Sequence, residues 1–246
     1  MKKSTLLLIL FLSIKVLSQE TDKNQISPST ILNKYLNSIG AAENKLDSIT
    51  SITTKYKATT AMGEFIIEKT TTPEKMQDKL YMAGNLLFDM VATKNECYQI
   101  SQGEKKLLPS TLCNDFKIFI GLIQEIGLLN SKNLSVKEVE FNGEKCYSIE
   151  IPGEGTTQNF VFSSSTGLKV NETSLTKSND KITKTSTLYK DYKAYNNLMF
   201  PTVQVSENFM STGIAVEFKL EEVKFNTEKS KNEIHNITQN KQTVYF

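Results

Sequence analysis

The chain has 246 residues, and 39% of them are hydrophobic, which is enough to build a core and excludes a globally disordered protein. The formal net charge is only +2, so charge does not favour binding to nucleic acid. Apart from one histidine, every basic residue is a lysine. The chain therefore lacks arginine, the side chain that most often recognises phosphates and carboxylates through paired hydrogen bonds.

The N-terminus has the three parts of a secretory signal peptide. Lys2 and Lys3 begin it, an almost unbroken apolar run covers residues 6–12, and Val16 and Ser18 occupy the −3 and −1 positions of a cleavage site. We therefore expect a signal peptide that ends at Ser18, and export of the mature protein to the periplasm or envelope of a Gram-negative bacterium. Elsewhere no run approaches the roughly 20 apolar residues that a transmembrane helix needs.

Three cysteines remain in the mature chain, at positions 97, 113 and 146. In an oxidising compartment an odd number permits at most one internal disulfide. Cys97 and Cys113 are the nearest pair, and closing that loop would add about 3 kcal/mol of stability. The alternative is that all three are small buried hydrophobic residues. No Cys-x-x-Cys or Cys/His spacing is present, so we expect neither a metal site nor a cofactor.

The first predicted element of the domain is a short helix. Ser27 is a good N-cap, Pro28 suits the first helical position and Gly40 suits the end. Such a short amphipathic helix needs a sheet to pack on. The residues that recur at helical spacing are Ile31, Leu32, Tyr35, Leu36 and Ile39.

From about residue 49 the pattern changes to a strand period, with β-branched runs between turn-forming residues. Asn142-Gly143 is the strongest hairpin signal. Roughly eleven antiparallel strands are expected, and a sheet of that size must curl or close to hide its edges. The predicted strands cover residues 49–60, 64–71, 75–83, 86–93, 135–141, 144–151, 158–163, 168–176, 182–194, 199–208 and 214–225.

This pattern divides the chain into four expected segments. They are the signal peptide (1–18), a linker (19–26), one folded domain (27–226) and a polar C-terminal tail (227–246).

One segment interrupts the strands, because residues 107–130 are too long for a hairpin loop. Asp115 is a candidate N-cap for a helix over residues 116–129, whose apolar arc is wider than the stripe of an ordinary surface helix. That arc can be buried in the core or around a ligand, so the helix either packs on the sheet or covers an apolar cavity. The candidate ligand contacts on it are Phe116, Phe119, Ile120, Ile123 and Ile126.

Aromatic and methionine side chains on the strands are the candidate lining on the sheet side. Methionine suits flexible lipid chains, but any β-sheet core uses the same residue types, so both interpretations stay open. The candidates are Phe65, Met82, Phe88, Met90, Tyr147 and Phe162.

Motifs of catalysis are absent from the sequence. The single histidine, His235, falls in the predicted tail, and the chain has no nucleophile elbow, zinc-peptidase motif or phosphate-binding loop. The neighbouring carboxylates Glu221 and Glu222 would point to opposite faces of a strand. We expect a binding protein, not an enzyme.

Several short motifs resemble those of envelope proteins related to the LolA/LolB lipoprotein carriers, which are common in Bacteroidetes. The motifs occur in the same order and spacing as in that family and span most of the predicted domain. They are YLNSIGAAE at 35–43, FNGEKCYSIE at 141–150, VF and STGL within 161–168, YKDY at 189–192 and MFP at 199–201.

The resemblance implies a mainly β (α+β) fold: an incomplete antiparallel β-barrel with helices plugging its open side. In the carriers an apolar cavity holds acyl chains, and a buried arginine, without counterpart here, regulates the lid. The sequence therefore predicts a periplasmic or envelope protein that binds a lipid-like or acyl ligand under a helical lid. The alternative is a protein-interaction or envelope scaffold module with a filled core, an envelope protein as partner and no small ligand.

Overall fold

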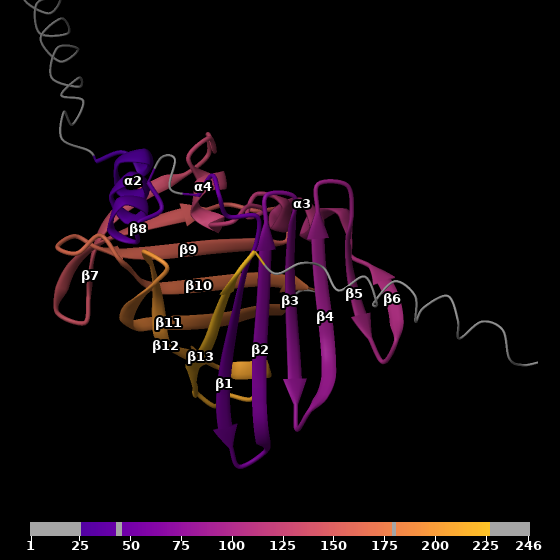
Figure 1. Cartoon of the computed structure of the whole chain (residues 1–246). Helices are drawn as coiled ribbons and strands as arrows, with labels where there is room; N and C mark the ends of the chain where they lie inside the picture. The colour runs from indigo at the N-terminus through magenta and orange to yellow at the C-terminus, as the bar shows by residue number, and fades with distance from the viewer. Residues whose placement is uncertain (1–25, 43–45, 179–180, 227–246) are drawn as a thin grey trace, which may run out of the picture.

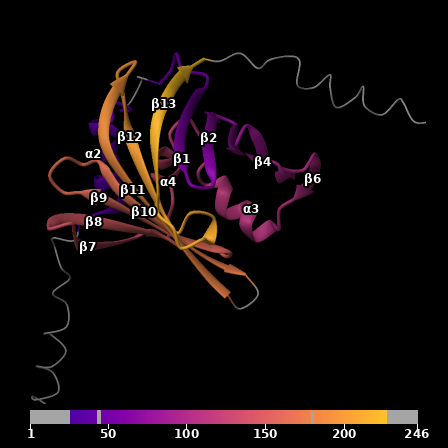
Figure 2. The ribbon, with the colours of Figure 1, turned by 90° about the horizontal axis from the view of Figure 1, so that it is seen from below.

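The computed structural model describes residues 26–42, 46–178 and 181–226 (Figure 1). The predicted signal peptide, nearly all of the predicted linker and the predicted tail with His235 lie outside the described residues. Within the described ranges, the dominant feature is one strongly curved antiparallel sheet (Figures 1 and 2).

The sheet contains 13 strands in the described part of the chain, in the order β6-β5-β4-β3-β2-β1-β13-β12-β11-β10-β9-β8-β7. Their bounds are β1 Ile52–Thr60, β2 Gly63–Thr72, β3 Lys75–Met82, β4 Asn85–Thr93, β5 Cys97–Ser101, β6 Glu104–Leu107, β7 Ser135–Phe141, β8 Glu144–Ile151, β9 Thr156–Ser163, β10 Lys169–Ser178, β11 Lys181–Tyr195, β12 Leu198–Glu207 and β13 Val216–Phe225. The helices are α2 Pro28–Ser38, α3 Ser110–Lys117, α4 Gln124–Leu128 and the 3-10 turn η1 Phe209–Ser211.

The open edges of the sheet are β6 and β7, and the chain between them, residues 108–134, carries α3 and α4. Figure 2 shows the sheet curled around α4, with α3 beside β4. The prediction of an incomplete antiparallel barrel with helices on its open side is confirmed. The prediction of about eleven strands missed β5 and β6. Strand β6 is exposed along its whole length and therefore shows no apolar alternation.

The first helix forms as its end signals predict. The Ser27 hydroxyl accepts a hydrogen bond from the Thr30 N–H at 3.2 Å, and Pro28 occupies the first turn. Gly40 follows at φ +77°, where a Cβ atom would lie 2.3 Å from the carbonyl oxygen of Asn197. Only glycine allows α2 to turn this closely past the β11–β12 hairpin.

The prediction of one helix over residues 116–129 is wrong. The chain forms α3 and α4 instead, with a non-helical segment at 118–123. Asp115 does not cap a helix: it lies inside α3, and its carboxylate accepts hydrogen bonds from the N–H groups of residues 154, 155 and 156 at 3.0, 2.9 and 2.8 Å. Gly127 lets α4 fold back, because a Cβ there would lie 2.2 Å from the Ile118 carbonyl oxygen.

A disulfide joins Cys97 at the start of β5 to Cys113 in α3, with a Cα–Cα distance of 5.4 Å. Cys146 is a free, buried thiol on β8. The disulfide ties the helical segment to the strands at one open edge of the sheet.

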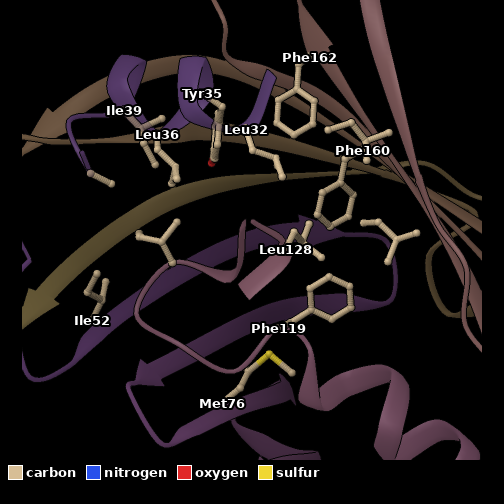
Figure 3. Close-up of a cluster of buried hydrophobic side chains, with 14 of the residues drawn as sticks. Leu32, Tyr35, Leu36, Ile39, Ile52, Met76, Phe119, Leu128, Phe160 and Phe162 are labelled. Atoms are coloured by element: carbon tan, nitrogen blue, oxygen red, sulfur yellow. The ribbon is translucent and has the colours of Figure 1, made fainter. Parts of the chain in front are cut away.

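The core consists of two clusters, which we name by position. The helix-side cluster lies under α2 and α4; Figure 3 shows Tyr35 beside Phe162, and Phe119 below Phe160. Its buried members are Ile31, Leu32, Tyr35, Leu36, Ile39, Ala41, Ile49, Ile52, Met76, Ala92, Cys97, Cys113, Phe119, Ile123, Leu128, Ile149, Ile151, Phe160, Phe162 and Leu198. The tip-side cluster lies toward the β1–β2 hairpin and comprises Tyr56, Ala58, Phe65, Leu80, Phe209, Val216 and Phe218.

Candidate functional site

A cavity of about 200 Å³ lies between α4 and the concave face of the sheet. Side chains from α2, β1, β2, α4, β10, β11 and β12, together with neighbouring turns, form its walls. Its apolar lining is Ile39, Ile52, Ile67, Leu122, Ile123, Met199, Phe200 and Pro201. Its polar lining is Tyr35, Thr54, Tyr56, Lys69, Thr71, Gln124, Glu125, Lys169, Glu172, Tyr189, Tyr192 and Gln204.

A buried ion pair forms one wall of the cavity. Lys169 Nζ lies 2.7 Å from Glu125 Oε1 and 3.0 Å from Glu172 Oε2, and the side chains of Lys169 and Glu125 are only 6% and 3% exposed. Strand β10 places Lys169 here beside a register shift in its pairing with β9. Burial of such charges is unfavourable unless they are paired and hydrogen-bonded, and the geometry meets both conditions.

The charged states of Lys169 and Glu172 follow from their neighbours. Burial alone would lower the pKa of Lys169, but Glu125, Tyr189 and Glu172 together raise that pKa well above its usual value. Burial alone would also raise the pKa of Glu172, but Lys169 and Lys69 hold it below its usual value. Lys169 and Glu172 are therefore charged at neutral pH.

Tyrosines complete the polar wall. The Tyr189 hydroxyl donates to Glu172 Oε2 at 2.9 Å, and the Tyr192 hydroxyl donates to the Lys169 carbonyl oxygen at 2.8 Å. The Lys169 ammonium also lies over two aromatic rings, 4.4 Å from the centroid of Phe160 and 4.8 Å from that of Tyr189. Burial raises the pKa of Tyr189 well above its usual value, so its hydroxyl remains a donor.

Polar contacts attach the α4 segment, residues 118–128, to both halves of the sheet. Glu125 pairs with Lys169 on β10. On β2, Lys69 Nζ donates to Gln124 Oε1 at 3.1 Å, and the Thr71 hydroxyl donates to the Leu122 carbonyl oxygen at 2.9 Å. These contacts hold the segment over the cavity, although the segment itself forms no strand of the sheet.

Asp78 is the polar side chain without a complete set of partners near this wall. Its Oδ1 atom is buried and has no hydrogen-bond partner. Asp78 pairs with Lys69 in the register of β2 and β3, so both side chains lie on the same face. Burial raises the pKa of Asp78, an effect that the nearby Lys69 opposes and Glu172 and Asp89 reinforce.

The structure distributes the predicted ligand contacts over three places. Ile123 lines the cavity. Phe119 and Phe162 belong to the helix-side cluster, and Phe116, Ile120, Ile126, Met90 and Tyr147 pack against it. Phe65 belongs to the tip-side cluster, with Met82 and Phe88 against it.

Sequence reasoning missed the buried ion pair. Glu125 falls within the segment predicted as a single helix, and Lys169 is one lysine among many in a β-strand pattern. A usable signal was present in the spacing of Lys169 and Glu172, because an opposite pair three residues apart on a strand with a bulge can meet on one face.

The described residues contain no group of three or more side chains that could hold a metal ion. None of their helices is long and apolar enough to cross a membrane.

Comparison with known proteins shows the fold. No protein-family model and no curated protein matches the sequence. Among solved structures, a LolA superfamily protein from Nitrosomonas europaea aligns with a TM-score of 0.52 and 10% identity, over 84% of this chain and 97% of that one. A DUF1329 family protein from Desulfovibrio piger aligns with a TM-score of 0.53 and 8% identity, over 81% and 93%. The chain therefore has the LolA-like fold.

Proposed function

We propose that this protein is an exported envelope binding protein that holds an amphipathic, acyl-bearing ligand between the α4 segment and the concave sheet. The observation that carries the proposal is the cavity itself, whose lining combines apolar side chains with a buried ion pair and several tyrosines. A ligand with an apolar chain and a polar end matches both kinds of lining. The solved relative from the LolA superfamily, whose fold the chain shares, supports this class of function.

The size of the cavity limits the ligand. About 200 Å³ is below the roughly 300–1,000 Å³ of common ligand pockets. A single short chain or the end of a longer one fits as the segment stands, whereas a larger ligand requires α4 to move. The polar contacts of Gln124, Glu125 and Leu122 and the packing of the segment oppose that movement.

The second candidate function is an interaction module with a filled core. It is favoured by the burial of Phe119, Phe160 and Phe162, which occupy space that a larger cavity would need. In this case the protein binds no small molecule and contacts a protein partner through its surface.

Cavity-filling variants separate the two candidates. Ile67 lines the cavity from β2, and its neighbour Ile66 points to the other face of the sheet. We expect wild-type protein purified without detergent to carry a lipid or fatty acid in native mass spectrometry, and to bind a fluorescent fatty acid saturably. Ile67→Trp should lose both properties, and the matched Ile66→Trp variant should keep them. A ligand-free mass with no saturable uptake by the wild type would favour the filled-core module.

A further inference from the structure

Three neighbouring hairpins end in tips without charged residues. The strand order β4-β3-β2-β1-β13-β12 puts the β3–β4, β1–β2 and β12–β13 turns at the same end of the sheet. Residues 59–63, 83–87 and 208–216, which we call the uncharged tips, contain no Asp, Glu or Lys, although 23% of the whole chain is charged. Figure 1 shows the first two tips at the lower end of the sheet.

The uncharged tips also carry most of the exposed apolar side chains. Six large hydrophobic side chains are exposed in the described part of the chain, and four of them lie on these tips. Each is about half exposed, and they come from three separate turns: Met62, Leu86, Met210 and Ile214. Isolated exposed hydrophobic residues are common, but their concentration at one end of a molecule marks an interaction surface.

The third tip holds its apolar side chain outward at an energetic cost. Met210 has φ 53° and ψ 27°, in the left-handed region that bulky side chains rarely adopt. The turn is fixed by Asn208 Oδ1, which accepts the Gly213 N–H at 2.8 Å, and by Phe209, whose ring packs 5.2 Å from that of Phe65. Phe209 is thereby buried and Met210 is exposed.

Some of the charges directly behind the tips are paired. Lys57 lies 2.6 Å from Glu64 and 3.7 Å from Glu221, and Lys219 lies 3.7 Å from Glu217. The tips themselves present no charged side chain to a partner. Apolar burial, not ion pairing, must therefore drive binding at the tips.

We infer that the uncharged tips form a membrane-contacting surface, which inserts its apolar side chains into the boundary between headgroups and acyl chains of a lipid bilayer. Separate side chains at the ends of hairpins suit a fluid surface, which closes around each one, whereas a protein partner needs a continuous complementary face. The tip-side cluster beneath supports the three tips as one unit. This inference is independent of the ligand in the cavity.

The absence of tryptophan from the chain allows a direct test. The Met210→Trp variant places a single reporter on a tip. The Leu107→Trp variant places one at another exposed apolar position, the last residue of β6, at the end of the sheet away from the tips. With vesicles of phosphatidylethanolamine and phosphatidylglycerol, we expect a blue shift and quenching by brominated acyl chains for Met210→Trp, and neither effect for Leu107→Trp. The same response is expected with phosphatidylcholine vesicles and at high salt.

A second measurement uses the otherwise natural chain. Replacing Met62, Leu86 and Met210 together by serine should weaken co-sedimentation with vesicles by about tenfold or more, while the circular dichroism spectrum stays unchanged. The inference is overturned by equal sedimentation of the triple variant and wild type, or by an equal response of both tryptophan reporters. It is also overturned if the tips instead mediate a dimer that forms without vesicles and that the triple variant abolishes.

Discussion

Lys169 on β10 and Glu125 on α4 form an ion pair of 2.7 Å that is almost fully buried and joins the sheet to the segment over the cavity. Lys169 has a second carboxylate partner, Glu172, on its own strand. The pair thus links the stability of the fold to the position of the segment that covers the cavity.

Removing one member of this pair should be strongly destabilising. Glu125→Ala leaves the Lys169 ammonium short of a partner, and we expect a loss of about 3 kcal/mol in the free energy of urea unfolding. The triple variant Glu125→Leu/Lys169→Met/Glu172→Gln should recover most of the loss, because it removes both charges of the pair and the carboxylate that also contacts Lys169. As a control, Lys94→Ala breaks an exposed pair with Glu74 and should change stability by less than about 1 kcal/mol. Equal effects of Glu125→Ala and Lys94→Ala would contradict this account.

Asp78 should make stability depend on pH in the opposite sense to most buried carboxylates. Its pKa is raised in the folded state, so between the ordinary and the raised pKa the folded chain binds more protons than the unfolded chain. Its contribution to stability therefore falls as pH rises through that window. Asp78→Asn should be more stable than wild type at neutral pH by about 1 kcal/mol, and the difference should disappear below about pH 4.

Glu172 is the matched control for Asp78, because its pKa is lowered in the folded state. Glu172→Gln should be less stable than wild type at neutral pH, and this deficit should shrink as the pH falls through the lowered pKa. Urea midpoints of both variants over a pH series check the two signs. A common sign for the two variants would contradict the burial and pairing described for them.

The disulfide should contribute substantially to stability. It closes a loop between residues 16 apart in sequence, for which we expect a loss of about 3 kcal/mol on reduction. Wild-type protein should unfold at lower urea concentration with dithiothreitol than without it. A Cys97→Ala/Cys113→Ala variant should be insensitive to the reductant, while Cys146→Ala should retain the sensitivity. Unfolding of the wild type that ignores the reductant would be inconsistent with this bond.

Met210→Gly should stabilise the fold while removing an apolar tip. Glycine adopts the left-handed conformation without strain, so a gain of about 1 kcal/mol is expected. Met62→Gly is the control: this residue has no positive φ, so added flexibility in the unfolded chain should leave stability unchanged or lower. A Met210→Gly variant less stable than wild type would show that the side chain itself supports the turn.

Much of the fold could be predicted, because its signals are local. Ser27, Pro28 and Gly40 define α2, and Asn142-Gly143 defines the β7–β8 hairpin. The course of the helical segment could not be predicted, because it depends on contacts outside each helix. Asp115 accepts hydrogen bonds from the turn after β8, and the Gly127 backbone lies against the Ile118 carbonyl group. The sequence pattern over 116–129 records apolar burial but not where the chain bends.

The candidate site was predictable only in outline. The resemblance placed a cavity between helix and sheet, and Ile123 lines the cavity that the structure contains. The other predicted contacts were chosen because they are apolar, and apolar residues fill a core as readily as they line a pocket. Local spacing indicates that Lys169 and Glu172 can meet on β10, but it does not reveal that Glu125 of α4 joins them.

The pairing of β1 with β13 has a consequence for how the molecule folds. Every other strand pair joins sequence neighbours, whereas Ile52 of β1 aligns with Phe225 of β13. Strands β1–β6 and β7–β13 can each grow hairpin by hairpin from short-range contacts, which form fast. The β1–β13 pairing can form only after both halves exist, so we expect it to be the slow step of assembly. Until it forms, the edges of β1 and β13 are open to pairing with another molecule.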